Sequence, residues 1–134
     1  MALLQSIEGI GKSYKQKLKE AGFSTTEQLL EKGASPAGRR SIAADTGVGE
    51  KMILRWVNMA DLFRIKGVGE EFSDLLEAAG VDTVPELAQR NAENLHAKMV
   101  EVNSVKKLVR RVPSLKEITG WIGQAKKLPR VMTY

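Results

Sequence analysis

The sequence predicts an all-α fold made of short helices in two repeated halves, and three observations support this prediction. Apolar residues recur at three- and four-residue intervals through most of the chain, the spacing that places them on one face of a helix. No segment alternates apolar and polar residues over more than a few positions, so strands are not expected. A Gly-apolar-Gly sequence that begins at Gly9 returns at Gly67, and each copy directly precedes an amphipathic run.

The glycine-bracketed turn is the feature around which the other elements are arranged. Residues 7–11 read IEGIG, residues 65–69 read IKGVG, and residues 46–49 hold a partial copy, TGVG. Two glycines around a buried aliphatic residue allow a tight turn with backbone conformations closed to other residues. The second glycine opens a helix whose first N–H groups lack intrahelical acceptors and favour an anion. A turn of this kind between two short helices is a helix-hairpin-helix, so the sequence predicts a tandem array of hairpins.

The first half of the chain gives helix start and stop signals in succession. An apolar stripe at helical spacing follows the first turn, and Gly22 suits the left-handed position beyond the helix end. The residues from Ser24 to Glu27 predict a capping box that opens the next helix, and Gly33 ends it. Ser35 then predicts the N-cap of a third helix. A fourth helix follows the partial turn and carries a buried stripe formed by Ile53, Trp56, Val57 and Ala60.

The second half repeats the first. A shift of 58 residues aligns eight identical residues over positions 7–29, including both glycines of the turn. Further on, Trp56 aligns with Trp121 only at a shift of 65, so about seven residues are inserted, around the basic segment 106–111. The fourth turn is expected at residues 112–115, where both glycines have been lost.

Each half therefore contains two predicted hairpins. We expect two double-hairpin units, residues 1–64 and 65–134, packed as one compact body of about ten short helices, the second unit being partly degenerate. This arrangement resembles tandem helix-hairpin-helix proteins. It is most similar to a bacterial family of unknown function built from repeated hairpins, which have been compared with the helix-three-turn-helix region of flap endonucleases. The resemblance covers nearly the whole chain and rests on the repeated Gly-apolar-Gly turns.

The resemblance implies DNA binding without sequence specificity, through hairpin backbone amides on phosphates. It also implies a monovalent cation held by hairpin carbonyls, with no other cofactor and no catalytic centre. The net charge of +5 and the pI of about 9.6 favour nucleic acid, DNA or RNA, as the partner. No cysteine and a single histidine exclude disulfide scaffolds and Cys-based zinc sites. Neither a signal peptide nor a membrane helix is apparent, so a cytoplasmic protein is expected.

Charge is unevenly distributed along the chain, and this distribution indicates which of the four turns is expected to bind a phosphate. Residues 1–64 carry a net +3, residues 65–101 a net −5 and residues 102–134 a net +7. The third turn is followed by Glu70 and Glu71, which repel a phosphate, so it is expected to be structural. The first two turns are the expected binding sites. The predicted nucleic-acid-binding residues are Gly9, Ile10, Gly11, Lys12, Ser13, Lys15, Gly47, Val48, Gly49 and Lys51.

A role as a protein-interaction or oligomer scaffold is the alternative, with the acidic second unit binding a protein partner. Glycine-bracketed hairpins also serve simply to pack helices, so the turn alone does not separate the two functions. An enzyme is not expected, and neither catalytic nor metal-binding residues are predicted. Residues 6–13 approach a phosphate-binding P-loop, but Ser6 stands where that motif requires glycine and no hydrophobic strand precedes it.

Overall fold

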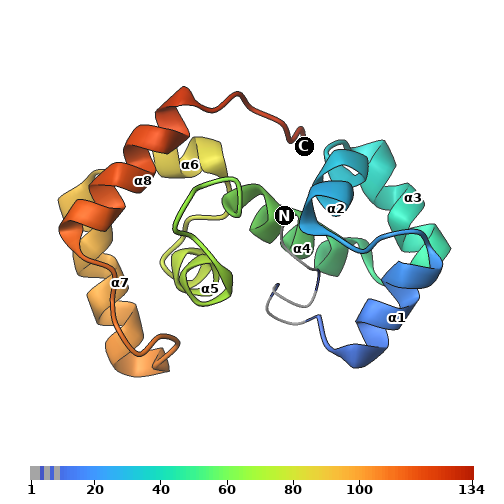
Figure 1. Ribbon diagram of the computed structural model, residues 1–134, viewed down its shortest axis with the longest axis horizontal. Coiled ribbons are helices and arrows are strands. Elements are labelled where there is room, and N and C mark those ends of the chain that lie inside the picture. Colours follow the sequence, from blue (N-terminus) through green and yellow to red (C-terminus); the bar gives the residue numbers. More distant parts are fainter. Residues whose placement is uncertain (1–3, 5–6, 8–9) are drawn as a thin grey trace. The chain divides into compact units, whose positions relative to one another are not determined.

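The computed structural model describes Leu4, Ile7 and residues 10–134. This part of the chain contains eight α-helices and no β-strand, so the expected all-α class is confirmed (Figure 1). The helices are α1 (Lys12–Glu20), α2 (Thr26–Gly33), α3 (Pro36–Thr46), α4 (Glu50–Leu62), α5 (Glu70–Ala78), α6 (Val84–Ala88), α7 (Ala92–Lys106) and α8 (Leu115–Lys127).

The expectation of about ten helices is wrong for the described residues, and α4 gives the reason. Five helices per half would require a separate helix before each of the first and third turns. The third turn is instead preceded directly by the end of α4, which also closes the first half of the chain. The segment before the first turn lies mostly outside the described residues.

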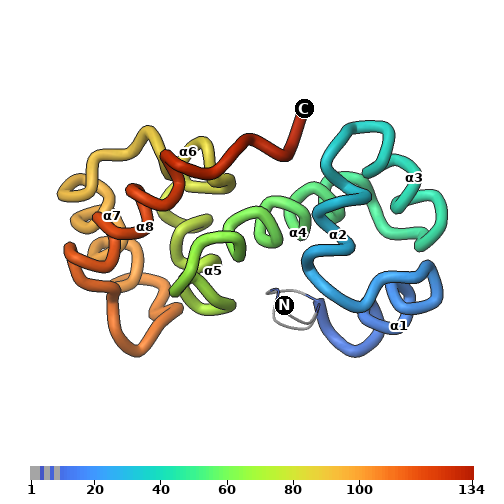
Figure 2. The backbone as a smooth tube through the Cα atoms, turned by 45° about the horizontal axis from the view of Figure 1, so that its top comes forward, coloured from blue at the N-terminus to red at the C-terminus, as the bar shows by residue number. Residues whose placement is uncertain are grey.

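The chain divides into two compact units. The first unit comprises residues 1–61 together with Val131–Tyr134, and the second comprises Leu62–Arg130. The backbone can be followed from one unit to the other through α4 in Figure 2. No helix among the described residues has both the length and the apolar character needed to cross a bilayer.

In the first unit, α3 packs against α1 and α2. The predicted stripe on α4 is confirmed, since its four members are at most 3% exposed. Trp56 from this stripe meets the Tyr14 ring of α1 edge-on, with 5.2 Å between ring centroids. An edge-to-face pair of this kind adds about 1 kcal/mol to the stabilisation from burial alone.

In the second unit, α8 packs against α6 and α7, and α5 against α7. Trp121 of α8 lies 5.3 Å from the Phe72 ring of α5, centroid to centroid. Phe72 follows Tyr14 by the repeat shift of 58, and Trp121 follows Trp56 by 65. Both units therefore contain an aromatic pair at corresponding positions, which joins α1 to α4 in the first unit and α5 to α8 in the second.

The ends of α1 and α5 have the same hydrogen-bond pattern. Gly22 and Gly80 both adopt positive φ, 96° and 94°. The following amides of Phe23 and Val81 donate back to Leu18 and Leu76, at 2.9 and 2.8 Å. These bonds define a Schellman motif at each helix end, and they confirm the left-handed position predicted for Gly22.

The predicted capping box of α2 is displaced by one residue. Thr25, not Ser24, is the N-cap: its hydroxyl accepts from the Gln28 amide, while the Gln28 side chain accepts from the Thr25 amide. The pairing follows the three-residue spacing of the motif, and Gln28 replaces Glu27 as the reciprocal partner. Ser35 caps α3 as expected, accepting from the Gly38 amide at 3.1 Å.

Two glycines permit the close approach of α2 to its neighbours. A Cβ at Gly38 would lie 1.9 Å from the backbone oxygen of Lys32. A Cβ at Gly33 would lie 2.5 Å from a methyl group of Val57. Both distances are far below van der Waals contact, so these positions are closed to a larger residue unless the backbone moves.

The C-terminal residues Val131–Tyr134 form part of the first unit, beside the end of α2. The amide of Thr133 donates to the Ala34 carbonyl at 2.7 Å, and the Arg39 guanidinium donates to the Thr133 carbonyl at 2.7 Å. Met132, the residue before Thr133, is 2% exposed, and the Tyr134 hydroxyl donates to the Asn58 side-chain oxygen at 3.2 Å. One buried side chain and several polar contacts thus fix this tail.

Candidate nucleic-acid interface

The first glycine turn is only partly described, because Glu8 and Gly9 lie outside the described residues. Ile10 is buried, at 4% exposure, and its amide donates to the Ile7 carbonyl at 3.1 Å. The buried aliphatic residue predicted for the turn is therefore confirmed. Gly11 follows as the N-cap of α1, in extended conformation with φ −82° and ψ −174°.

The start of α1 is open and basic. Gly11 supplies no side-chain cap, and the first turn of the helix contains no acidic residue. Lys12, Ser13 and Lys15 are exposed. Apart from its two chain neighbours, no described residue has an atom within 4 Å of the position that a Cβ of Gly11 would occupy. Unoccupied space, uncapped amides and two lysines together create a surface suited to an anion.

The second turn lies between α3 and α4. Gly47 ends α3 in left-handed conformation with φ 73°, and Val48 is buried at 6% exposure. The Thr46 hydroxyl supports the turn by accepting from the Val48 amide and donating to the Ile42 carbonyl. Gly49 and Lys51 are exposed, but Glu50 lies in the first turn of α4. This start is therefore less favourable to an anion than that of α1.

The third turn has the same backbone hydrogen bond as the described part of the first, but not its charge. Val68 donates to the Ile65 carbonyl at 3.2 Å, as Ile10 does to Ile7. Gly67 has φ 96°, and a Cβ there would lie 3.0 Å from Nε1 of Trp121. The uncapped start of α5 contains Glu70 and Glu71. These carboxylates favour the helix dipole and oppose an incoming phosphate.

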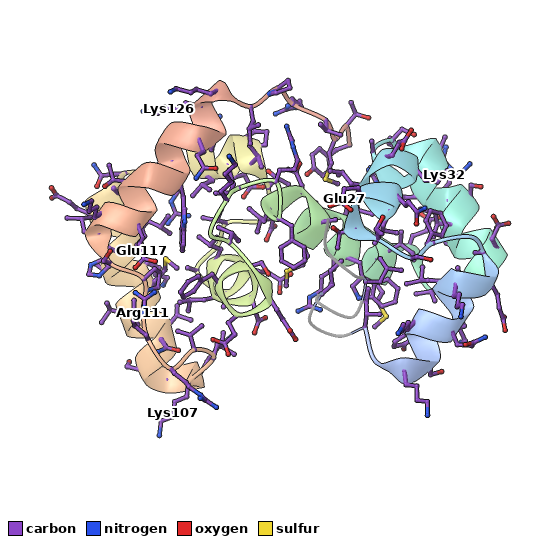
Figure 3. The ribbon with its side chains drawn as sticks, in the orientation of Figure 1. Glu27, Lys32, Lys107, Arg111, Glu117 and Lys126 are labelled. Carbon is purple, nitrogen blue, oxygen red and sulfur yellow. The ribbon has the colours of Figure 1, made fainter. Side chains whose placement is uncertain are left out.

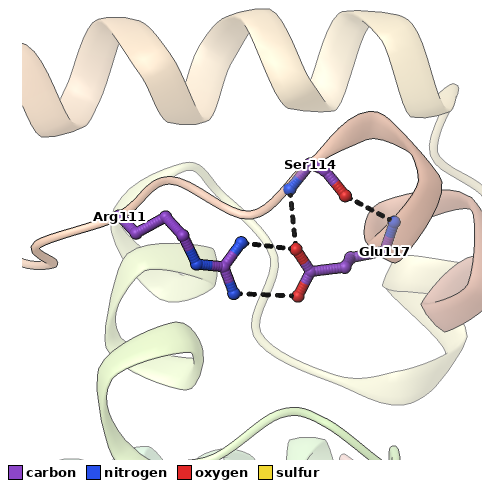
Figure 4. A network of polar contacts seen from close by, with 3 residues as sticks. All are labelled: Arg111, Ser114 and Glu117. Atoms are coloured by element: carbon purple, nitrogen blue, oxygen red, sulfur yellow. Dashed lines mark hydrogen bonds and ion pairs between the residues drawn. The ribbon is translucent and has the colours of Figure 1, made fainter.

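The fourth turn is closed by its own side chains. Pro113 is buried where the second turn has Val48, and Ser114 replaces the second glycine. Ser114 and Glu117 form a complete capping box at the start of α8. Glu117 also accepts two hydrogen bonds from Arg111, at 2.6 and 3.2 Å (Figure 4). The amide of Ser114, at the position of the second glycine, thus already donates to the Glu117 side chain.

The same contacts shift two ionisation equilibria. The hydrogen bonds from Arg111, followed by that from the Ser114 amide, lower the pKa of Glu117 to about 2. The hydrogen bond and charge of Glu117 in turn raise the pKa of Arg111. Both shifts favour the charged forms of the pair.

A pH titration tests this arrangement. Because the pKa of Glu117 is lowered on folding, its contribution to stability is complete above about pH 4.5 and is lost as the pH falls through about 2. We expect a carboxyl NMR titration of Glu117 to have its midpoint near 2. In Arg111→Gln the midpoint should move upward, because the strongest hydrogen bonds to the carboxylate are removed. A midpoint of 4.5 in the parent protein would contradict the described pairing.

The inserted basic segment forms an ordered loop between α7 and α8. It comprises residues 107–114, counted from the left-handed C-cap of α7 to the N-cap of α8. The corresponding second turn, counted in the same way between α3 and α4, comprises only residues 47–49. Lys107 has φ 50°, and the Asn103 side chain both donates to and accepts from the backbone of Val109. Lys107 and Arg111 are exposed on this loop (Figure 3).

All described members of the predicted site lie in the first unit. The sequence prediction did not include a pocket beside the second turn, lined in part by Arg39, Arg40 and Tyr134. Only the folded tail brings Tyr134 to these arginines, so no local sequence signal identifies it. The described residues contain no group of three or more histidine, cysteine or acidic side chains able to hold a metal.

The two units and their matching turns define an all-helical protein with an internal repeat. The chain belongs to the DUF4332 family, a domain of unknown function, whose family model matches residues 8–128. Comparisons with curated proteins and with solved structures gave no match.

Proposed function

We propose that the glycine turns are helix-hairpin-helix motifs and that the chain binds DNA through the first of them, without sequence specificity and without catalysis. The observation that supports this most is the start of α1, where uncapped amides, an open Gly11 and exposed Lys12, Ser13 and Lys15 occur without an acidic residue. Backbone amides and lysines contact phosphate oxygens, which are the same in every sequence. The second turn, with Gly49 and Lys51, supplies a weaker contact.

The four turns differ in ways that support this assignment. The third turn has the same backbone hydrogen bonds as the first but two carboxylates at its helix start. The fourth has its helix start closed by Ser114 and Glu117. The starts of α1 and α5 both have a glycine N-cap without a side-chain cap, at a cost of only about 0.3 kcal/mol relative to a capping residue. Of these two open starts, only that of α1 has no acidic residue in its first turn, and this is what supports a phosphate contact there.

A duplex-binding titration at several salt concentrations tests the proposal. Two usable turns suggest about three to five phosphate contacts, and hence a slope of log affinity against log salt of roughly −3 to −5. Lys12→Gln should weaken binding several-fold at low salt for every duplex sequence and reduce the magnitude of the slope by about one. Fluorescence anisotropy of a labelled duplex measures both quantities.

Lys19→Gln is the matched control, since this exposed lysine lies at the other end of α1 and the net charge changes equally. With both variants compared at about 0.15 M salt, where the Debye length is about 8 Å, we expect it to change the affinity by less than about twofold, because its charge lies roughly 10 Å along the helix from Lys12. Equal losses in the two variants would reject the first turn as the contact. Absence of salt dependence would reject DNA binding and favour the scaffold alternative. Tighter binding to an RNA duplex would change the partner but not the contact.

A further inference from the structure

The positive charges of the second unit are concentrated in one segment, from the end of α7 through the inserted loop to the end of α8. Residues 106–127 contain seven lysine and arginine residues but one acidic residue, Glu117, which is paired with Arg111 at 2.6 Å. Figure 3 shows Lys107 and Lys126 at opposite ends of this segment. The exposed carboxylates of the unit lie on other helices, namely Glu70, Glu71, Glu86, Glu93 and Glu101.

Six cations of this segment are exposed, and within the described chain none of them forms an ion pair. We call these six residues the basic surface: Lys106, Lys107, Arg110, Lys116, Lys126 and Lys127. Because no carboxylate is paired with these cations, the basic surface carries a strong positive potential and attracts anions.

The packing of α8 fixes which of its sides is exposed. Its apolar side is buried, with members that are at most 6% exposed: Ile118, Trp121, Ile122 and Ala125. The Gln124 side chain accepts from the Lys66 amide at 2.8 Å and donates to the Lys66 carbonyl at 3.1 Å. These contacts hold α8 against the rest of the second unit in one orientation.

Lys116 and Lys127 project from the exposed side of α8. They lie about three helical turns apart, so they point in nearly the same direction at a separation of roughly 16 Å. Gly120 and Gly123 lie between them on the same side of the helix. Because glycine has no side chain, these two positions do not hold a long anionic partner away from the lysines.

The loop before α8 places the remaining cations on an ordered backbone. The Asn103 side chain fixes the backbone at Val109, at 3.0 and 3.1 Å. Arg111 lies over the Phe72 ring, 5.7 Å from the ring centroid, and donates to Glu117. An ordered loop loses less conformational entropy on binding than a flexible one, so more of the interaction energy of its cations is available for affinity.

The residues around the basic surface favour a nucleic-acid backbone over a lipid surface. A helix that lies on a membrane inserts an apolar side beside its lysines, but the apolar side of α8 is buried within the unit. The large apolar residues exposed in the second unit are single side chains of two helices, Val100 and Val105 of α7 and Leu115 of α8. Too little apolar surface is therefore available for insertion into a bilayer.

The same surroundings favour duplex DNA among nucleic acids. Proteins that bind single strands stack bases on exposed aromatic rings, whereas the aromatic side chains of residues 62–130 are buried or half-buried. The neutral polar side chains of α8 are already bonded within the chain, Thr119 to the Leu115 carbonyl and Gln124 to Lys66. They are therefore not available to read base edges or the 2′-hydroxyl groups of RNA.

We infer that the basic surface binds the phosphate backbone of duplex DNA through its lysine and arginine side chains. A duplex carries about one negative charge per 1.7 Å of its axis, so a straight row of cations meets phosphates along its whole length. The basic surface belongs to the second unit and uses side chains, whereas the contact proposed at the first turn belongs to the first unit and uses backbone amides. The two contacts are independent of each other, and phosphates bound here add to those expected at the turns.

An NMR titration of the full chain with a DNA duplex of about twelve base pairs tests the location of this contact. We expect the amide signals of Gly120 and Gly123 to shift and to saturate, because both residues lie between lysines of the basic surface. The Gly80 signal, from the end of α5 opposite to Phe72, should not move. Unmoved signals of Gly120 and Gly123 would overturn the inference. The Gly11 signal reports separately on the first turn, so failure of one contact is distinguishable from failure of the other.

Substitution of exposed lysines tests the contribution of the side chains. Lys116→Gln and Lys127→Gln should each weaken duplex binding several-fold at about 0.15 M salt and reduce the magnitude of the salt slope by about one. Lys98→Gln is the matched control: this exposed lysine of α7 lies roughly 12 Å along the helix from Lys106, and its loss removes the same charge. We expect that control to change the affinity by less than about twofold. Equal weakening by all three variants would show a general effect of charge and overturn the assigned surface.

Other polyanions test the chemical identity of the partner. The DNA duplex should bind more tightly than a single strand of the same length and than polyglutamate, whose charges lie about 3.4 Å apart even in an extended chain. Equal affinity for polyglutamate would show an unselective attraction of anions and overturn duplex recognition. Tighter binding of the single strand, of an RNA duplex or of phosphatidylserine vesicles would overturn the assignment to duplex DNA.

Discussion

Replacement of Gly38 by alanine is expected to destabilise the first unit by about 3 kcal/mol, the upper part of the range for overpacking. The added Cβ would lie 1.9 Å from the backbone oxygen of Lys32, so relief requires α2 and α3 to separate. Separation would also strain the cap at Ser35, whose hydroxyl accepts from the Gly38 amide. Urea unfolding followed by circular dichroism measures the change.

Gly120→Ala provides the contrasting substitution. Gly120 lies inside α8, and apart from its chain neighbours and the backbone of α8 itself no described residue has an atom within 4 Å of its Cβ position. Alanine is favoured over glycine inside a helix by about 1 kcal/mol, so this variant should be more stable than the parent. A Gly38→Ala protein as stable as the parent would show that α2 and α3 are not held at the described separation.

Replacement of Gly67 by alanine should destabilise the second unit by about 2 kcal/mol. Two effects contribute: φ of 96° is strained for any residue with a side chain, and the new Cβ would press on Nε1 of Trp121 at 3.0 Å. Displacement of Trp121 would in turn disturb its contact with Phe72. Unfolding followed by tryptophan fluorescence reports on this site, provided that Trp56 is replaced by phenylalanine in both proteins being compared.

Gly69→Ala is the matched control from the same turn. Gly69 has φ −114° and nothing within 4 Å of its Cβ position. Alanine is a poorer N-cap than glycine, which destabilises the protein, but it also lowers the entropy of the unfolded chain, which stabilises it. These effects roughly cancel, so we expect the free energy of unfolding to change by less than about 0.5 kcal/mol. If both substitutions cost the same, the positive φ of Gly67 is not what restricts that position to glycine.

The signals that predicted this fold from sequence were local ones. Gly22 ends α1 and Ser35 caps α3 as predicted, because both depend on residues within one helical turn. The stripe on α4 is buried for the same reason, as helical spacing alone places its members on one face. The repeat also contained a signal that was not used. The shift that aligns the glycines also aligns Tyr14 with Phe72, and these rings pack on the two aligned tryptophans.

The features that could not be predicted depend on residues far apart in the chain. The sequence predicts Gly33 as a helix stop, whereas packing against Val57 is what excludes a side chain there, and the Lys32 carbonyl excludes one at Gly38, for which the sequence gives no signal. The pocket depends on the contact between Arg39 and Tyr134, which are more than ninety residues apart in the sequence. The capping box of α2 was misplaced because consecutive serine and threonine residues offer two registers, and Gln28 selects the second.

The membership of Val131–Tyr134 in the first unit has a consequence for cooperativity. The second unit is an insertion of 69 residues between two segments of the first. In the folded second unit, a hydrogen bond from Arg64 to the Pro129 carbonyl joins its two ends. Residues 61 and 131 of the first unit are therefore held near each other. When unfolded, the insertion becomes a flexible loop whose closure costs on the order of 4 kcal/mol in chain entropy. Unfolding of the second unit therefore weakens the attachment of Val131–Tyr134 to the first unit. The two units share part of their folding free energy through chain connectivity alone.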